Sequence, residues 1–392
     1  MKKIFFIVLV FSSLFAYSAV DPSYNIDIAN FKMRDPFVFV DTIGKSYFIH
    51  ANSGDNLTFT VYQSKDLIKW KNLGKSFTAA SDFWGKLDFW APDMFLYNGK
   101  YYLIATFSSS TITRGCGILV ANSPQGPYAP LVNNPITPSD LSCCDGTLYI
   151  DNGQPYLLFT GSPGQFGLGL IYTQKLSLDL KTTVGDPILL TRASNSPWAR
   201  TITVNGVTGY AADAPFIYRN SNNELIMLWS SFSGGKYRIG VVRSTSGLMT
   251  GPWIHDAAPI NDDDGGHAMI FKSLEGKIKI SYHSPNAYPN YVIISDLNTL
   301  IADLNIPEDV SLIPHVFPNP VSNLLTIESD ASCMTTYIDV CDMSGVVLKH
   351  YLNSRLVNRF DISTSDLQNA TYIIRIGTDT GVVYSRKIIL KK

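Results

Sequence analysis

Residues 93–103 read DMFLYNGKYYL and contain the structural unit that this chain repeats. An acidic residue precedes a short apolar strand, an Asn-Gly pair makes the turn, and an aromatic-rich strand follows. Residues 145–158, DGTLYIDNGQPYLL, have the same order. Apolar and aromatic residues on both sides of an Asn-Gly turn are typical of antiparallel β-hairpins. The two segments therefore indicate an all-β protein that is built from a recurring hairpin.

The hairpin occurs five times between residue 31 and about residue 290. Its turns lie at Gly44, Gly99, Gly153, Asn223 and Gly276, so that successive turns are 55, 54, 70 and 53 residues apart. Each interval also contains further short strands, and about four strands in a period near 50 residues are typical of a β-propeller blade. We therefore expect a five-bladed β-propeller over residues 20–302. A β-sandwich, which is the alternative, would need no such repeat.

The residue that precedes the first strand of each unit is acidic in four of the five cases; the set is Asp35, Asp93, Asp145, Asp213 and His267. In a propeller the first strand of every blade lines the central channel, so we expect these side chains to converge at one mouth of the channel. Carboxylates in one pocket are costly unless they share protons, bind a cation or perform acid–base chemistry. Their matched positions favour catalysis over the alternative, in which each Asp only caps a turn or a strand start.

Paired carboxyl groups can hydrolyse a glycosidic bond. At a separation of roughly 6.5–9.5 Å one protonates the leaving oxygen while the other activates a water molecule, which gives inversion. A third carboxylate would raise the pKa of the acid by like-charge repulsion. Just four of the 32 acidic residues are glutamate, so this chemistry would fall mainly to aspartate.

Composition limits the classes of function. The chain has 392 residues, which favours two domains. Its formal net charge is −1, so it carries no electrostatic footprint for nucleic acid or an anionic membrane. Charged residues make up 16% and aromatic residues 12% of the chain. This mixture excludes a disordered or coiled-coil chain.

The first residues have the pattern of an export signal. Lys2 and Lys3 precede an apolar run from Ile4 to Phe15, and small residues follow up to Ala19. The run is too short to span a bilayer, so we expect a secretory signal peptide over residues 1–19, with a membrane anchor as the alternative. No later stretch of the sequence is long and apolar enough to span a membrane.

The five cysteines match no metal-binding spacing. Because export permits disulfides, the open possibilities are a bond from Cys116 to Cys143 or Cys144, and one from Cys333 to Cys341. The sequence alone does not choose among them.

The pattern changes after about residue 300. Residues 303–314 contain two prolines and are typical of a linker. Residues 315–392 then carry short alternating strands with polar turns, which predict a small Ig-like β-sandwich. We assign no chemistry to this second domain.

The propeller region resembles glycoside hydrolase family 43, a family of five-bladed arabinosidases and xylosidases. The resemblance covers about residues 31–290 and rests on the order and spacing of residues 34–38, 62–70, 89–93, 145–149, 213–216 and 265–268. It implies a secreted, inverting hydrolase of α-L-arabinofuranosyl or β-D-xylosyl linkages in plant cell-wall polysaccharides such as arabinan and arabinoxylan. The alternative is a catalytically weak or inactive glycan-binding propeller, and a scaffold for protein partners is a third possibility.

The resemblance also implies a role for each of three carboxylates. Asp35 corresponds to the general base, and Asp145 to the residue that modulates the pKa of the acid and orients it. Asp213 stands where the family usually has a glutamate as its general acid. The carboxyl group of Asp213 reaches one methylene less far, and this difference motivates the inactive alternative.

Further side chains are candidates for binding substrate or an ion. The candidates for substrate binding are Trp90, Asp93, Arg34, Phe232 and Arg238, of which Trp90 is the first choice for a wall against the sugar ring. Trp84 and Phe89 are weaker aromatic candidates. His267 resembles the axial histidine of the family, which touches an axial water or a calcium or sodium ion; its alternative is a hydrogen-bonded core side chain. No cofactor is otherwise expected.

The C-terminal unit resembles the type IX secretion sorting domain, on the evidence of residues 317–322, 340–345, 369–372 and 385–392. The resemblance implies export through the periplasm to the cell surface or the medium, with the secretion machinery as a partner. A carbohydrate-binding sandwich is the rival interpretation, but this region has no tryptophan to form a binding platform. The expected partners are therefore a plant polysaccharide or oligosaccharide and the secretion machinery, without nucleic acid or a transmembrane segment.

Overall fold

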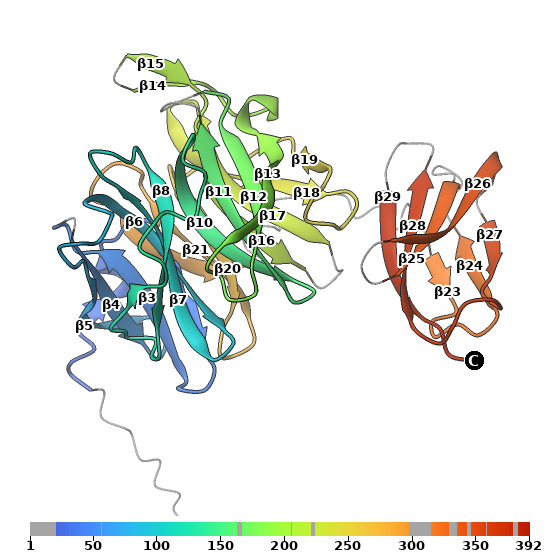
Figure 1. The fold of residues 1–392 in the computed structure, drawn as a ribbon, viewed down its shortest axis with the longest axis horizontal. Coiled ribbons are helices and arrows are strands. Elements are labelled where there is room, and N and C mark those ends of the chain that lie inside the picture. Colours follow the sequence, from blue (N-terminus) through green and yellow to red (C-terminus); the bar gives the residue numbers. More distant parts are fainter. Residues whose placement is uncertain are drawn as a thin grey trace, which may run out of the picture.

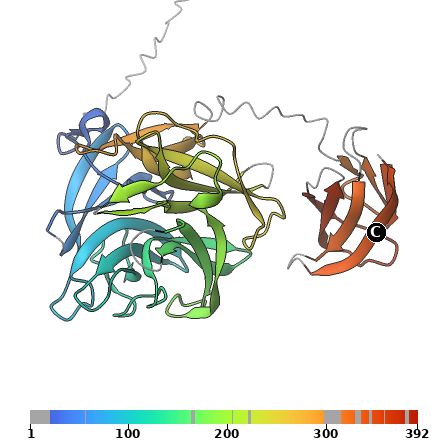
Figure 2. The same cartoon turned by 90° about the horizontal axis from the view of Figure 1, so that it is seen from above.

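The computed structural model describes residues 21–392 apart from residues 56, 163–166, 205, 221–223, 298–314, 329–334, 343–345, 358 and 379–382. The predicted signal peptide and the predicted linker therefore lie outside the described residues. The described part consists of β-strands and two one-turn 3₁₀ helices, Ile28–Asn30 and Ala193–Asn195. Five antiparallel sheets follow one another around a ring, from blue to orange in Figure 2. The predicted all-β fold with a five-bladed propeller is confirmed.

The first and last sheets close the ring. The first sheet contains β1 (Ile26–Asp27), β2 (Phe39–Asp41), β3 (Ser46–Asn52), β4 (Thr58–Ser64) and β5 (Lys69–Thr78), and the fifth contains β20 (Gly266–Lys272), β21 (Ile278–Ser284) and β22 (Tyr291–Asp296). The backbone N–H of Val292 donates to the carbonyl of Phe31 at 2.9 Å, and that of Met33 donates to the carbonyl of Asn290 at 3.1 Å. These bonds cover the outer edge of the last sheet with N-terminal residues, so this edge is not left open.

The three middle sheets are four-stranded meanders, in which strands that are neighbours in sequence pair in space. The second sheet contains β6 (Leu87–Tyr97), β7 (Lys100–Ser108), β8 (Gly115–Ala121) and β9 (Ala129–Pro130). The third contains β10 (Ser142–Asp151), β11 (Gln154–Ser162), β12 (Leu170–Leu176) and β13 (Thr183–Arg192). The fourth contains β16 (Asp213–Arg219), β17 (Leu225–Ser233), β18 (Lys236–Ser244) and β19 (Trp253–His255).

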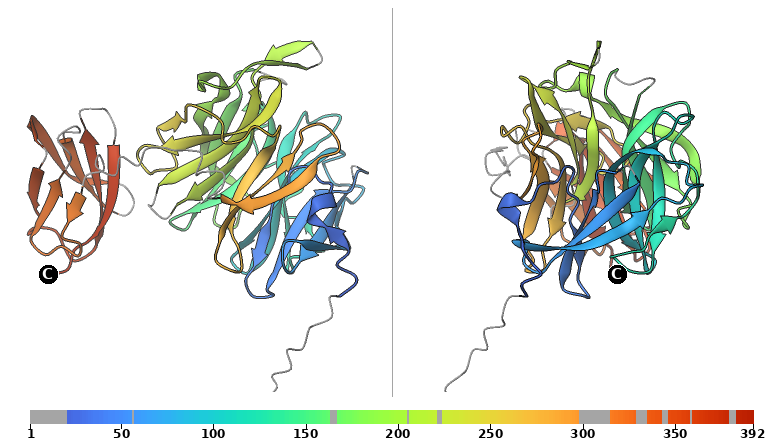
Figure 3. Two further views of the ribbon diagram at one scale, coloured as in Figure 1. Left: turned by 180° about the vertical axis from the view of Figure 1, so that it is seen from behind. Right: turned by 90° about the vertical axis from the view of Figure 1, so that its left-hand side faces the viewer.

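The one long interval of the repeat, 70 residues, contains an additional hairpin. Its strands are β14 (Ile202–Val204) and β15 (Val207–Gly209), between the third and fourth sheets. The hydroxyls of Thr203 and Thr208 lie 2.7 Å apart across the hairpin. The hairpin stands out from one end of the ring (Figure 1, Figure 3). The irregular spacing in the sequence therefore marks an insertion at this end.

The first strand of each of the last four blades contains a bulge. The pairing shifts between Trp90 and Asp93 in β6, Cys144 and Thr147 in β10, Asp213 and Phe216 in β16, and Gly266 and Met269 in β20. In each case the second residue of the bulge has a positive φ: 44° at Ala91, 53° at Asp145, 51° at Ala214 and 60° at His267. Such values are uncommon for residues other than glycine, and a bulge bends its strand and redirects the side chains. The bulges therefore bend these four strands at or beside Asp93, Asp145, Asp213 and His267, the residues that we expected at the channel.

Aromatic side chains pack between the first two blades. Phe59, Phe77, Phe83, Phe89 and Phe107 form one cluster, in which the rings of Phe89 and Phe107 lie 4.9 Å apart. Phe89 is fully buried, and Trp84 packs edge-on against Phe107 at 5.5 Å. Trp84 and Phe89, the weaker candidates for a sugar wall, therefore belong to the packing of the blades.

The C-terminal residues form two sheets with a shared core. One sheet contains β23 (His315–Phe317), β24 (Leu324–Glu328) and β27 (Arg359–Ser363), and the other contains β25 (Thr335–Cys341), β26 (Val347–Val357), β28 (Thr371–Thr378) and β29 (Val383–Ile389). Leu325 and Ile327 of the first sheet are buried in one cluster with Ile338 and Val340 of the second. The predicted β-sandwich is confirmed. Among the residues that the structure describes, no helix has the length and apolar character needed to cross a membrane.

Candidate active site

Four of the five matched residues lie in one cavity. Asp35, Asp145, Asp213 and His267 line an open space of about 420 Å³. Its walls also include Arg34, Trp90, Arg114, Cys144, Phe232, Tyr237 and, from the additional hairpin, Ile202 and Val204. The volume lies within the usual range for small-molecule sites. The expectation that residues from different blades converge at one mouth of the channel is thus met for these four.

Asp35 is a buried carboxylate beside an imidazole. Its Oδ1 lies 3.1 Å from His267 Nδ1 and 3.5 Å from Arg34 Nε. Burial opposes the negative charge, but the charge of His267 outweighs it and holds the pKa of Asp35 well below its ordinary value. Burial likewise opposes the positive charge of His267, and Asp35 outweighs it, which raises the pKa of His267 to about 9. At neutral pH the two residues are therefore an aspartate and an imidazolium.

His283 orients Asp35 from the other side. Its Nδ1 accepts a hydrogen bond from the backbone N–H of Asp35 at 3.2 Å, and burial lowers the pKa of His283. A neutral ring that accepts through Nδ1 fixes the backbone without adding charge. The nearby Oδ1 of Asp35 has no aligned hydrogen bond, although His267 and His283 lie within 3.3 Å of it. This oxygen is shielded from solvent, so the two imidazoles hold one side of the carboxylate in place.

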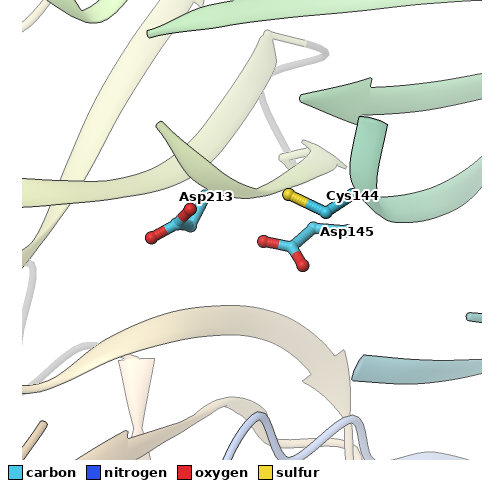
Figure 4. A group of neighbouring side chains, drawn as sticks. All are labelled: Cys144, Asp145 and Asp213. Carbon is cyan, nitrogen blue, oxygen red and sulfur yellow. The ribbon is translucent and has the colours of Figure 1, made fainter. Parts of the chain in front are cut away.

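Asp145 and Asp213 form a second, closely spaced pair. Their carboxylate oxygens lie within 4.8 Å of each other and of Cys144 Sγ, and Figure 4 shows the three side chains together. Burial, and then the charge of Asp145, raise the pKa of Asp213 to about 7. Burial raises the pKa of Asp145 as well, but its Oδ2 accepts a hydrogen bond from the backbone N–H of Ala214 at 2.9 Å, which favours the charged form. The shared proton therefore resides on Asp213.

The three aspartates thus differ in protonation state because their neighbours differ. Asp35 is ionised beside a cation, whereas Asp213 is protonated beside an anion. An ionised carboxylate and a carboxylic acid in one cavity are the components of general acid–base hydrolysis. Asp145 supplies the charge that keeps the proton on its neighbour.

Two aromatic residues that were predicted to bind substrate, Trp90 and Phe232, line the cavity. Trp90 keeps 39% of its surface exposed. The guanidinium carbon of Arg114 lies 4.9 Å from the centre of the Trp90 ring, and Arg114 Nε lies 3.4 Å from a carboxylate oxygen of Asp88. This contact supports one side of the indole and holds it at the cavity wall.

Arg34 and Arg238 differ in their placement. Arg34 lines the cavity while its NH1 group donates to the side-chain oxygen of Asn286 at 3.0 Å. Arg238 does not belong to the described lining: its NH1 group donates to the backbone carbonyl of Asn261 at 2.8 Å and pairs with Asp262. Arg238 thus lies on β18 with its side chain held by the loop residues Asn261 and Asp262, away from the position that we expected.

Asp93 also lies apart from the main cavity. It is 7% exposed and, with Asp145 and His267, lines a second cavity of about 10 Å³. Burial raises the pKa of Asp93 to about 7. The bulge in β6 explains the difference, because it aligns Trp90 with Asp213 and aligns Asp93 with Thr147. Asp93 thus faces the small cavity, and Trp90 occupies the place at the main cavity that the sequence pattern predicted for Asp93.

The small cavity is the place where the expected axial ion would lie. Its volume is about 10 Å³, which is close to the space needed for one water molecule. Calcium prefers about six to eight oxygen ligands. The described lining offers the carboxylates of Asp93 and Asp145 and the imidazole of His267, which is protonated at neutral pH, among mainly apolar side chains. The residues present do not fit a calcium ion held by the protein alone. A structural calcium or sodium ion on the propeller axis stays a prediction.

Several residues at the site lie outside the repeat positions from which the sequence predicted the channel residues, so the repeat could not reveal them. Tyr237 lies on β18, the third strand of the fourth blade, and His283 lies on β21, the second strand of the fifth blade. Arg114 lies in a loop before β8. Cys144 is the exception: it immediately precedes Asp145 and is aligned by its bulge with Trp90 and Asp213. Aligning the blades by these bulges, rather than by the acidic residues, would have found it.

The thiols near the site are free. Cys116, Cys143 and Cys144 form no disulfide in this structure, so the possible bond from Cys116 to Cys143 or Cys144 is not present. Adjacent strand residues point to opposite faces, and Cys143 is buried in the core while the thiol of Cys144 lies 3.0 Å from the hydroxyl of Thr160. Cys341 is also free, and its possible partner Cys333 lies outside the described residues.

The family model of the Glycosyl hydrolases family 43 matches residues 24–305, which contain all five sheets of the propeller. The chain belongs to glycosyl hydrolase family 43. The resemblance inferred from short sequence segments is therefore confirmed, and so is the expectation of an O-glycosyl hydrolase. Asp35, Asp145 and Asp213 lie in the cavity of this family 43 propeller.

Three similar proteins are informative. An endo-arabinase of known crystal structure from Bacteroides thetaiotaomicron VPI-5482 is 52% identical with a TM-score of 0.68, over 69% of this chain and 96% of that one. The extracellular endo-α-(1→5)-L-arabinanase 1 of Bacillus subtilis (strain 168) is 26% identical over 221 residues, 53% of this chain. A non-reducing end α-L-arabinofuranosidase of Bacteroides ovatus is 22% identical over 255 residues, 60% of this chain. The matches span 62% and 42% of the lengths of these two curated relatives.

The second domain of this family 43 chain has its own match. The model of the secretion system C-terminal sorting domain covers residues 315–391, which form the β-sandwich. The resemblance to a sorting domain is confirmed. The domain indicates a secreted or cell-surface location for the protein.

Proposed function

We propose that this chain is an endo-acting arabinanase that cleaves internal α-1,5-L-arabinofuranosyl linkages of arabinan with inversion. The observation that carries the proposal is the 52% identity to an endo-arabinase along 96% of that protein. A second relative is an extracellular endo-α-(1→5)-L-arabinanase. Of the two sugars that the sequence left open, these relatives favour arabinose over xylose.

The cavity supplies the groups that the reaction needs. Asp35, ionised beside His267, removes a proton from a water molecule as its oxygen bonds to the anomeric carbon. Asp213 gives its proton to the glycosidic oxygen as the bond from that oxygen to the anomeric carbon breaks. Asp35 ends protonated and Asp213 ionised, and exchange of one proton with solvent restores both. Water attacks the face opposite to the leaving group, so the configuration inverts.

The cavity also offers surfaces for a chain of sugars. Trp90 presents an indole face beside the catalytic carboxylates, and the hairpin residues Ile202 and Val204 form an apolar wall. We propose that sugar rings on either side of the cleaved bond lie against these surfaces, with Arg34 and Phe232 beside them. Amphipathic sugar rings bind aromatic faces well because one side of the ring is apolar.

Location follows from the second domain. We propose that the secretion machinery recognises the sorting domain after the chain has crossed the periplasm, and that the predicted signal peptide directs the first step. The substrate would then be a plant polysaccharide outside the cell or an oligosaccharide derived from it.

The test is a product analysis with the full mature chain and an Asp35→Ala control. Both proteins are incubated with linear arabinan, arabinoxylan and xylan, and the products are followed by chromatography. A ladder of arabino-oligosaccharides from the wild type alone is the expected result. Xylose-containing products would overturn the choice of sugar, and arabinose as the sole early product would overturn endo action.

A glycan-binding propeller without turnover is the second candidate, because Asp213 replaces the longer glutamate of the family pattern. The same experiment decides it. Wild-type protein that is folded and retained on arabinan, but releases no sugar, would establish binding in place of catalysis.

A further inference from the structure

We propose that Tyr237 is a positioning residue that determines which oxygen of Asp213 carries the catalytic proton. The inference rests on the proposed hydrolysis, because it concerns how the acid of that reaction is held. Tyr237 lies on β18, the third strand of the fourth blade, and Asp213 lies at the start of β16. The Tyr237 hydroxyl donates a hydrogen bond to Asp213 Oδ2 at 3.0 Å.

This hydrogen bond divides the two oxygens of the acid. Oδ2 accepts the phenolic proton, so a neutral Asp213 carries its own proton on Oδ1. A carboxylic acid without such a partner can place its proton on either oxygen and can rotate about the bond to the carboxyl group. With Tyr237 in place, the acid presents one defined O–H group.

The tyrosine ring is itself fixed on several sides. It is 1% exposed, stacks on His283 with ring centres 5.7 Å apart, and contacts Phe232 with ring centres 5.0 Å apart. At Gly266 a Cβ atom would lie 2.1 Å from a ring carbon of Tyr237, so a glycine is required there. The Gly265-Gly266-His267 segment thus makes room for the ring on the blade that carries the axial histidine.

The same contacts connect the acid to the base. His283, which stacks on Tyr237, accepts the hydrogen bond from the backbone N–H of Asp35. Arg34 lies over the Tyr237 ring at 5.9 Å and 3.5 Å from the Asp35 carboxylate. Tyr237 therefore fixes Asp213 relative to the residues that hold Asp35.

A positioning role has particular value for an aspartate. Its carboxyl group lies one methylene closer to the backbone than that of a glutamate, so an error in its direction is not corrected by a longer side chain. The bulge at Asp213 and the positive φ of Ala214 set the direction of the side chain, and Tyr237 sets its rotation. The hydroxyl thus compensates for the shortened acid.

The first test compares wild type with Tyr237→Phe in the full mature chain. On arabino-oligosaccharides kcat should fall about 10- to 100-fold, the effect of losing a hydrogen bond to a charged or ionisable group, with KM within about twofold. On an aryl arabinofuranoside, whose leaving group needs little protonation, the loss should be small. Equal losses on both substrates would indicate a purely structural role and overturn the proposal.

The pH profile gives a second readout. The Tyr237 hydrogen bond lowers the pKa of Asp213, against burial and the charge of Asp145, which raise it; His267 and Arg34 also face this carboxyl group and lower its pKa. Removing the hydroxyl should therefore move the basic limb of kcat/KM to higher pH. 3-Fluorotyrosine at position 237 keeps the ring in place and makes the hydroxyl more acidic, so it should move the limb to lower pH even if Tyr237→Phe does not fold. A limb that stays in place in the fluorinated protein would refute the positioning role.

A double-mutant cycle shows whether Tyr237 acts through Asp213. The Asp213→Asn variant has no acid to position, so adding Tyr237→Phe should cost nothing further on arabino-oligosaccharides. A matched control is Tyr282→Phe: Tyr282 is buried, and its hydroxyl donates to Asp263 Oδ2 at 2.9 Å outside the cavity. The control should keep wild-type kcat. An additional loss in the double variant would overturn the proposal.

The failure of the proposed function is separable from this result. If the wild type hydrolyses xylo-oligosaccharides instead of arabino-oligosaccharides, the choice of sugar is wrong, and the same cycle on that substrate decides the role of Tyr237. If the wild type hydrolyses neither, both proposals are overturned together, since there is then no acid step to position.

Discussion

Replacing Asp145 by asparagine should move the basic limb of the pH profile to lower pH. That limb reports the acid, which must be protonated, and the pKa of Asp213 is about 7. The carboxylate oxygens of Asp145 and Asp213 lie within 4.8 Å, so two unit charges there repel by about 3 kcal/mol at an effective dielectric constant of about 20. This energy corresponds to about two pH units. Asp145→Asn removes the charge and keeps the shape of the side chain.

The consequence is a large loss at one pH and a small one at another. At pH 7 an acid whose limb has moved down by about two units is protonated in roughly 1% of molecules, compared with about half in the wild type. Activity of the variant on arabinan should therefore fall about 90-fold between pH 4 and pH 7, whereas the wild type should lose only about half of its activity over the same interval.

The assay is kcat/KM on linear arabinan between pH 4 and pH 9, with an aryl arabinofuranoside as the second substrate. The decisive quantity is the position of the limb, not the height of the profile, because an orientation effect would lower all points equally. A limb that remains near pH 7, or that moves up, would refute the assignment of Asp145 as the source of the charge. The aryl substrate should show the limb weakly, since its leaving group needs less protonation.

Three further predictions concern stability, binding and packing. Asp213 has a pKa of about 7 when folded and an ordinary value of 3.8, so its contribution to stability decreases as the pH rises through this interval. Asp213→Asn should therefore raise Tm by several degrees at pH 8 and not at pH 4, as measured by scanning fluorimetry. An equal or lower Tm of the variant at pH 8 would contradict this. Trp90→Ala should raise KM for arabinan about tenfold with the pH limbs unmoved, whereas Tyr288→Ala, at an 85% exposed site outside the described cavity lining, should leave KM unchanged. Gly266→Ala places a Cβ atom 2.1 Å from the Tyr237 ring and should destabilise the propeller by about 1–3 kcal/mol in chemical denaturation. Gly167→Ala is the matched control, because no atom lies within 4 Å of the added carbon. Equal denaturation midpoints for the two variants would show that the Tyr237 ring can move aside.

The repeat was readable from the sequence because each blade carries its own local signals. The Asn-Gly turn at residues 98–99 and the apolar runs beside it specify a hairpin without reference to the rest of the chain. The unequal interval of 70 residues likewise corresponds to the hairpin β14–β15 at the cavity. Local pattern was sufficient for the number of blades and for the end of the channel at which residues gather.

The register of the strands within a blade was harder to predict from the sequence. The sequence pattern aligned Asp93 with Asp145 and Asp213, but the bulges align Trp90 with Asp213 and place Asp93 deeper, level with Thr147. A bulge adds a residue on one strand only and leaves no fixed sequence mark. The position of Asp93 therefore depended on backbone geometry that the spacing of acidic residues does not contain.

Contacts between blades could not be predicted from the sequence. Tyr237 reaches Asp213 within its own blade, but its ring is held by His283 of the next blade and by the space at Gly266. Gly266 and His283 follow Tyr237 by 29 and 46 positions in the sequence, and nothing local to any of the three residues indicates the others. Arg114 on Trp90 is a similar case, since an arginine in a loop is most often exposed.

In the proposed mechanism every catalytic carboxylate belongs to an aspartate, so intrinsic acid strength cannot distinguish the acid from the base. The difference in pKa between the two carboxyl groups must come from the charges beside them, and the fold places a positive charge beside one and a negative charge beside the other. The fifth blade brings His267 to Asp35, and the resulting ion pair keeps the base ionised. The third blade brings Asp145 to Asp213, and the resulting repulsion keeps the acid protonated. If this reasoning is correct, exchanging the neighbours would exchange the protonation states: a cation at position 145 should convert Asp213 into an ionised carboxylate and abolish proton donation, even though Asp213 itself is unchanged.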